Sequence, residues 1–157
     1  MALSLAVLLV PVFILLAVYR YGFSGDAPIA VDAADTWAAA RHGAHFTVLE
    51  PTGLPARWTV ISATYGGGTL RVGYVLPDGS GVQLVESDRS IDDLVPAELG
   101  TGARVGNLAR IGDQLWRSYP VTDRGDRALV RVDTGRTTIV LGSATAEDLR
   151  AFATTLH

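Results

Sequence analysis

The chain has 157 residues, a length that makes one domain. Of these residues 48% are hydrophobic, and the formal net charge is −3. The acidic balance argues against a nucleic-acid-binding protein, which needs a basic surface to neutralise phosphate. The absence of cysteine excludes disulfides, thiolate metal sites and a cysteine nucleophile. All 13 basic residues are arginine, so Schiff-base and P-loop lysine chemistry is excluded as well.

The chain begins with an apolar segment. Residues 2–19 are interrupted only by Ser4 and Pro11, and such a run in a helix covers about 27 Å, enough for a thin bilayer. The run is apolar on every face, which argues against an amphipathic helix packed on a soluble core. The sequence therefore predicts a single transmembrane helix over residues 1–20, followed by a glycine-containing linker over residues 21–31.

Tyr19, Arg20 and Tyr21, at the end of this run, are of the types that lie at the membrane–water interface. The positive-inside rule, applied to Arg20 alone, places that side in the cytoplasm. One arginine is weak evidence. We predict the opposite orientation, in which the N-terminus is cytoplasmic and the domain extracytoplasmic, and this prediction does not rest on charge. The alternative to a retained anchor is a cleaved signal peptide, but the nearest small-residue site, at residues 31–33, lies well past the apolar run.

The remaining chain, residues 32–157, is predicted to form one extracytoplasmic domain that starts with a helix. Asp32 is placed to cap an alanine-rich helix, and Gly43 is placed to end it. The β-branched and aromatic residues of 46–49 and 57–65 predict two strands.

Two more strands follow through tight turns. Apolar side chains alternate along residues 69–76, and the alternation resumes at Val82 and Leu84 after a Pro-Asp-Gly turn. Strands joined in this way make an antiparallel meander. Ser90 is then placed to cap a short helix that Pro96 and Gly100 limit.

The closing part of the chain predicts further strands and a final helix. The strand candidates are residues 103–111, 114–121, 127–132 and 136–141. Thr145 is placed to cap a helix whose apolar residues recur at i, i+3, i+4 and i+7 from Leu149. The whole pattern predicts an α+β fold, in which an antiparallel meander sheet has its helices packed on one face, after the transmembrane helix.

Several short motifs occur in an order that is similar to that of a known family. They are Phe46 to Leu49, Gly53-Leu54-Pro55-x-x-Trp58, Gly73-Tyr74-x-x-Pro77-Asp78-Gly79, Trp116-x-x-Tyr119, Arg127-Ala128-Leu129-Val130-Arg131 and Thr145 to Arg150. With the anchor and the alanine-rich helix, they resemble the domain-of-unknown-function 4245 family over about residues 2–156. The resemblance implies an actinobacterial protein with one N-terminal membrane helix and an extracytoplasmic domain. It implies no activity and supplies no functional residues.

No combination of residues predicts an enzyme. His42 and His45 are close in sequence, but Gly43 between them ends the predicted helix, and a metal site would need a further ligand such as Glu50. Ser80 has no evident base beside it. The sequence therefore predicts no catalytic site, no metal site and no cofactor.

Arginines on the strands are the candidates for binding an anionic partner. Arg127, Leu129 and Arg131 alternate along one predicted strand and so share a face. Arg71 is expected on the same outer face, where several guanidinium groups match an anionic polymer or a lipid head group. The plainer interpretation is a solvated face balanced by nearby acids. The aromatic residues on the strands offer an alternative site, a pocket lined by Trp58, Tyr65, Trp116 and Tyr119, but aromatic residues on strands more often fill the core.

Three functions stay open on this basis. The first is a membrane-anchored, non-enzymatic domain at the cell envelope that binds an envelope protein or an anionic polymer, and no nucleic acid. The second is a carrier of a lipid or other apolar ligand, which requires an apolar cavity of roughly 300–1,000 Å³ between the sheet and the helices. The third is an envelope hydrolase, for which the sequence offers no nucleophile–base pair.

Overall fold

The computed structural model describes residues 29–120 and 122–156, which form a seven-stranded antiparallel sheet and three helices. The strands are β1 (Thr59–Gly66), β2 (Thr69–Val75), β3 (Gly81–Ser87), β4 (Leu108–Ile111), β5 (Gln114–Tyr119), β6 (Arg127–Asp133) and β7 (Arg136–Gly142). The helices are α2 (Ala34–Gly43), α3 (Ile91–Leu99) and α4 (Ala146–Thr154). The predicted α+β class is confirmed.

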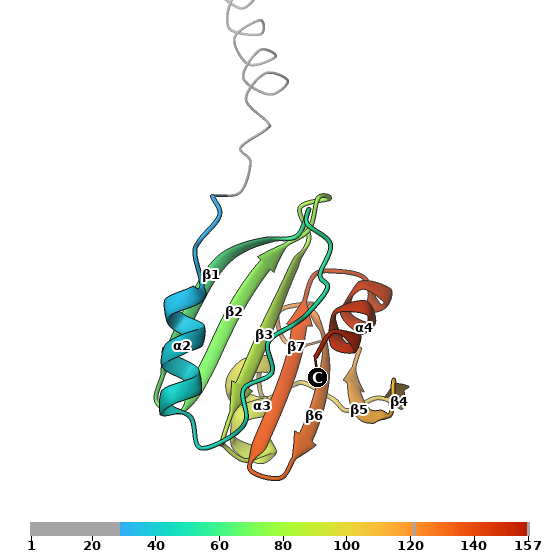
Figure 1. The fold of residues 1–157 in the computed structure, drawn as a ribbon. Helices are drawn as coiled ribbons and strands as arrows, with labels where there is room; N and C mark the ends of the chain where they lie inside the picture. The colour runs from blue at the N-terminus through green and yellow to red at the C-terminus, as the bar shows by residue number, and fades with distance from the viewer. Residues whose placement is uncertain (1–28, 121, 157) are drawn as a thin grey trace, which may run out of the picture.

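The sheet consists of two meanders that meet in its middle. The strand order is β1-β2-β3-β7-β6-β5-β4, so β1 to β3 form one meander and β4 to β7 the other (Figure 1). The two join where β3 pairs with β7, with Gln83 opposite Leu141 and Ser87 opposite Thr137. The connection that contains α3 carries the chain from β3, at this junction, to β4 at the far edge.

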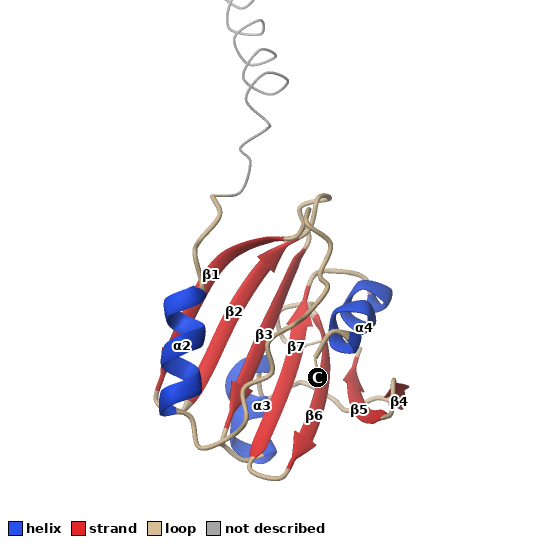
Figure 2. Cartoon of the chain, viewed as in Figure 1, coloured by secondary structure: helices blue, strands red, loops and turns tan. Residues whose placement is uncertain are grey.

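The helices lie on both faces of the sheet, so the prediction that they pack on one face is wrong. In Figure 2, α2 and α4 lie in front of the sheet and α3 lies behind it. On the front face, Leu84 and Val140 are buried in one core cluster with Phe152 of α4. On the back face, Ile139 is buried with Leu94 of α3 in a second cluster.

The central strands explain this arrangement. All five residues from Thr137 to Leu141 on β7 are buried, as are those from Leu84 to Ser87 on β3. Successive side chains on a strand point to opposite faces, so both faces of these strands need a cover. The alternation of apolar and polar residues, from which a single inner face was predicted, holds only for the outer strands.

Residues 46–49, predicted as a strand, form no strand. They belong to an irregular segment, residues 44–58, which we call the strap. The strap runs from the end of α2 diagonally across the front of the sheet to the start of β1 (Figure 1). Its side chain at Leu49 is buried, at 5% exposure, so the strap covers part of the front-face core.

The helix ends are set by local residues, largely as predicted. The Asp93 backbone N–H donates to Ser90 Oγ at 3.3 Å, and the Asp148 N–H donates to Thr145 Oγ1 at 3.1 Å. α3 is as short as predicted, but it continues past Pro96 to Leu99 and ends at Gly100, its C-cap, so of the two predicted limits Gly100 is the one that ends the helix. Proline removes one hydrogen bond from the helix, and here the last turn forms without it.

The predicted anchor and its interface residues Tyr19, Arg20 and Tyr21 lie outside the described residues. At the start of the described part, the Val31 N–H donates to the Val60 carbonyl at 2.8 Å, so the end of the predicted linker meets β1. Within the part of the chain that the structure describes, no helix combines the length and apolarity needed to cross a membrane.

Candidate functional site

A row of polar side chains crosses the front face among apolar neighbours. The register places Arg131 of β6 opposite Thr138 of β7, and Thr138 opposite Glu86 of β3. Trp116 of β5 extends the row, because the centre of its ring lies 5.1 Å from the guanidinium carbon of Arg131. We call these four residues the polar row. All four are buried, with Arg131 the most exposed at 6%.

Four buried side-chain atoms in and beside the polar row have no hydrogen-bond partner among the described residues. They are Glu86 Oε1, Trp116 Nε1, Thr138 Oγ1 and, two residues before it on β7, Arg136 Nε. Buried polar groups are nearly always paired, because an unpaired one costs about 1–3 kcal/mol. Trp116 Nε1 and Arg136 Nε are donors only, and Thr138 can donate as well. Glu86 Oε1 is an acceptor, so the unpaired atoms include both donors and an acceptor that do not meet at hydrogen-bond distance.

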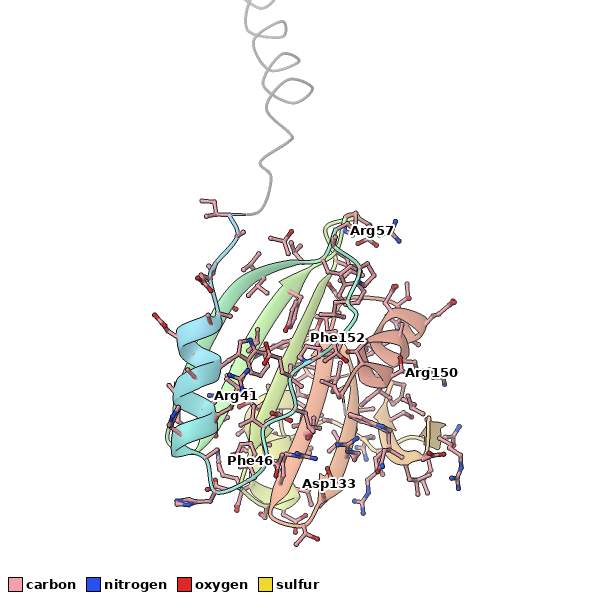
Figure 3. All side chains as sticks on the ribbon, viewed as in Figure 1. Arg41, Phe46, Arg57, Asp133, Arg150 and Phe152 are labelled. Carbon is pink, nitrogen blue, oxygen red and sulfur yellow. The ribbon has the colours of Figure 1, made fainter. Side chains whose placement is uncertain are left out.

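Asp133, at the end of β6, holds two arginines in place. Its Oδ2 accepts hydrogen bonds from Arg131 Nε at 3.0 Å and from Arg136 Nη2 at 2.5 Å. Asp133 and Arg136 are paired across the turn of the β6–β7 hairpin, and Figure 3 labels Asp133 at that end of the sheet. The Trp116 ring supports the guanidinium plane of Arg131 from one side. Arg131 is thus fixed both in its plane and in its direction.

The remaining edge of the Arg131 guanidinium is free. In the structure as described, this group donates to Asp133 through Nε, and no residue of the described ranges accepts from Nη1 or Nη2. The side chain is 7% exposed, and its terminal nitrogens are not among the atoms closed off from solvent. A guanidinium fixed in this way presents two donors as a fork, a geometry that matches a carboxylate or a phosphate.

Arg131 belongs to the wall of a cleft of about 480 Å³. The strap, the β4–β5 turn, the β6–β7 hairpin and the end of α4 build this cleft. Its apolar lining residues are Leu49, Ile111, Ala153 and Leu156, and its charged lining residues are Asp113, Arg131, Asp133 and Arg136. A second hollow, of about 820 Å³, shares Leu49, Asp133 and Arg136 with the first.

Two side chains of the sheet hold the strap against this cleft. The Leu49 backbone N–H donates to Glu86 Oε2 at 3.0 Å, and an Arg136 terminal nitrogen donates to the Thr47 carbonyl. Both bonds join side chains of central strands to the strap backbone. The position of Leu49 as a cleft wall therefore depends on the charged groups beneath it.

Burial raises the pKa of Glu86 to about 7. The main cause is the loss of water around the carboxyl group, which disfavours the charged form. The hydrogen bond from the Leu49 backbone and the positive charges of Arg136 and Arg131 act in the opposite direction, with Arg136 Nε 4.0 Å from Glu86 Oε1. Glu86 is therefore about half protonated near neutral pH.

The arginines predicted to share one outer face are separated. Arg71 lies opposite Val85 on the back face, where it forms an ion pair with Glu98 of α3. Arg131 lies on the front face, buried, and Arg127 is exposed near the start of β6. The prediction for Arg71 is wrong because alternation cannot tell inner from outer face when both are covered. Of the three arginines, Arg131 lines the cleft.

Glu86, Asp133 and Arg136 are missing from the predicted site. A signal for them is present in the sequence. Arg131 and Asp133 lie two residues apart on one strand, and Arg136 and Thr138 lie two apart on the next. A two-residue turn between these strands brings all four side chains to the same face. On β3, Glu86 continues the alternation of Val82 and Leu84, so its charged side chain is expected on the same face as these two apolar residues.

The other predicted residues lie away from this cleft or in the core. Trp116 is completely buried, which confirms its prediction as a core residue. His42 Nδ1 lies 2.7 Å from the Ala38 carbonyl of its own helix, and His45 is exposed. Within residues 29–120 and 122–156, no three or more histidine and acidic side chains gather as metal ligands would.

Comparison with known families shows which family the chain belongs to. The family model described as "Protein of unknown function (DUF4245)" matches residues 1–156. The chain belongs to this family. No curated protein and no solved structure matches it. The family description indicates no activity, so the function of this DUF4245 protein is argued below from the cleft.

Proposed function

We propose that this DUF4245 protein is a single-pass membrane protein whose extracytoplasmic domain, residues 32–157, binds a small molecule at the cell envelope without transforming it. Residues 1–20 are the anchor in this proposal, with the N-terminus in the cytoplasm. The observation that carries the binding site is the Arg131 guanidinium, held by Asp133 and Trp116 with its remaining edge free beside the cleft.

The cleft has the general properties of a small-molecule site. Such sites are concave, have volumes of roughly 300–1,000 Å³ and combine apolar walls with a few fixed polar groups. The cleft volume is about 480 Å³, and its walls combine residues such as Leu49 and Ile111 with the fixed Arg131. The three arginines do not form one anion-binding face, because Arg71 lies on the opposite face from Arg131.

Binding is favoured over catalysis by the position of the titratable groups. Glu86 has the raised pKa of an acid–base candidate, but it is 0% exposed and does not line the cleft. The Thr154 hydroxyl, which belongs to a lining residue, donates to the Ala151 carbonyl of its own helix. Among the described lining residues there is no histidine or serine to serve as base or nucleophile.

A methyl-NMR titration tests the binding site. The full chain, labelled at Leu, Ile and Val methyls in lipid nanodiscs, is titrated with benzoate, benzyl alcohol and benzylamine, three probes of one shape and different charge. We expect at least one probe to shift the methyl signals of Leu49, Ile111 and Leu156. Leu94 and Leu99, which belong to α3 on the back face, serve as the internal control. Absence of cleft shifts with all three probes at millimolar concentration contradicts the proposal.

Two further measurements address the remaining parts of the proposal. Alkaline phosphatase fused to the C-terminus is expected to be active and β-galactosidase inactive, because the first folds outside and the second inside the cytoplasm. The reverse pattern overturns the predicted orientation.

Incubation with p-nitrophenyl acetate and p-nitrophenyl phosphate is expected to release no nitrophenol above background. Release that Glu86→Gln abolishes would establish an enzyme.

A further inference from the structure

We propose that the ligand of the cleft is an amphiphile with a single anionic head, a carboxylate or a phosphate. Its head pairs with the free edge of Arg131, and its apolar body lies against Leu49, Ile111 and Leu156. This inference rests on the proposed function, because it names the chemical class that the binding site accepts.

The charges at the cleft select an anionic head. Arg131 and Arg136 share one carboxylate oxygen of Asp133, so on the hairpin two positive groups have one fixed negative partner. The Glu86 carboxyl, 4.0 Å from Arg136 Nε, does not line the cleft, and its burial disfavours the charged form. Asp113 also lines the cleft, but it is exposed at the β4–β5 turn, where water screens its charge. Arg131, 7% exposed, is not screened to that extent. A cationic head would meet like charge here, and a neutral head would leave the guanidinium fork without a charged partner.

The size and lining of the cleft call for an apolar body behind that head. Its volume of about 480 Å³ equals that of about 16 water molecules, at ~30 Å³ each, far more than one inorganic anion occupies. Four lining residues, Leu49, Ile111, Ala153 and Leu156, are apolar. An apolar chain that covers them removes hydrocarbon surface from water on both partners.

A head-group series on the unaltered protein tests the charge preference. Hexanoate, hexyl phosphate, 1-hexanol and hexylammonium share one tail, and the shifts of the Leu49 and Ile111 methyls report their binding inside the cleft, whatever fraction enters the nanodisc lipid. We expect at least one of the two anions to bind tenfold or more tightly than hexanol and hexylammonium. The tighter of the two anions identifies the head as carboxylate or phosphate.

A tail series and a matched pair of variants complete the test. Hexanoate is expected to bind about fifteenfold more tightly than butyrate, because two more methylenes are buried. Arg131→Lys keeps the charge but loses the planar fork, and is expected to weaken hexanoate at least tenfold without changing hexanol. Arg110→Lys, at an exposed arginine of β4, is the control and is expected to change neither.

The outcomes separate this inference from the proposed function. Equal binding of all four head groups, or hexanoate binding that Arg131→Lys leaves intact, overturns the anionic amphiphile and leaves a small-molecule site standing. Absence of cleft shifts with every probe overturns both. Should Arg131→Lys fail to fold, as its circular dichroism would reveal, the two series on the unaltered protein still decide the question.

Discussion

Replacing Glu86 by glutamine tests whether burial controls the charge state of the polar row. The Glu86 carboxyl is 0% exposed, and burial raises its pKa from 4.5 to about 7. Between these pH values the unfolded chain has released the proton and the folded chain retains it, so stability falls as pH rises. The contribution is complete below pH 4.5 and lost by pH 7, and at 1.36 kcal/mol per pH unit it amounts to about 3 kcal/mol.

Glutamine has nearly the shape of the protonated acid and does not titrate. We therefore expect Glu86→Gln to match the wild-type free energy of unfolding near pH 4.5 and to exceed it by about 3 kcal/mol above pH 7. Urea unfolding followed by tryptophan fluorescence, in half-unit steps from pH 4.5 to 8, measures this difference. Other titrating groups contribute to both proteins and cancel in the comparison.

A surface carboxylate provides the control. Glu147→Gln, in the exposed first turn of α4, is expected to lower the free energy of unfolding by less than about 1 kcal/mol, through the lost interaction with the helix dipole. The decisive contrary result is a Glu86→Gln variant that is less stable than wild type at pH 8. It would mean that Arg131 and Arg136 outweigh burial and keep the Glu86 carboxylate charged in the folded protein.

Three other substitutions test the fold, each by urea unfolding. Phe152→Ala empties a fully buried site in the front core and is expected to cost about 3–5 kcal/mol; a cost under 1 kcal/mol would contradict its central position. Thr145→Ala removes the α4 cap and is expected to cost about 1 kcal/mol, most of which Thr145→Ser should restore. Gly142→Ala places a Cβ 2.0 Å from the Gly81 carbonyl oxygen and should prevent β3–β7 pairing. Its control is Gly79→Ala, which has a positive φ of 84° but no atom near the new Cβ, and which should cost only about 1–2 kcal/mol. Equal effects of the two glycine substitutions would argue against that close approach.

Local features of the fold were accessible from the sequence because they depend on neighbouring residues. Ser90 and Thr145 cap their helices through side chains that reach only three residues along the chain. Residues 46–49 of the strap are predicted as a strand for a related reason. β-branched and aromatic residues favour any half-buried extended surface, and residues 46–49 supply one by lying across the sheet rather than joining it.

Long-range features were not accessible. The pairing of β3 with β7 places these strands in the middle of the sheet, where helices cover both of their faces, and no local sequence pattern predicts this pairing. For the same reason, alternation correctly placed Arg127 and Arg131 on one face of β6 but could not relate that face to the one that carries Arg71. Glu86 meets Arg136 only through this pairing, so the signals within the β6–β7 hairpin and within β3 could not show that the two parts of the site come together.

The junction of the two meanders has a consequence for biosynthesis. Until residues 136–142 leave the ribosome, β3 is an unprotected edge, and the side chain of Leu84 on its front face has neither β7 beside it nor α4 above it. The nascent chain therefore cannot complete its core during most of translation. A premature stop anywhere before the last strand would release a polypeptide with a bare hydrophobic edge, prone to aggregate and to be degraded.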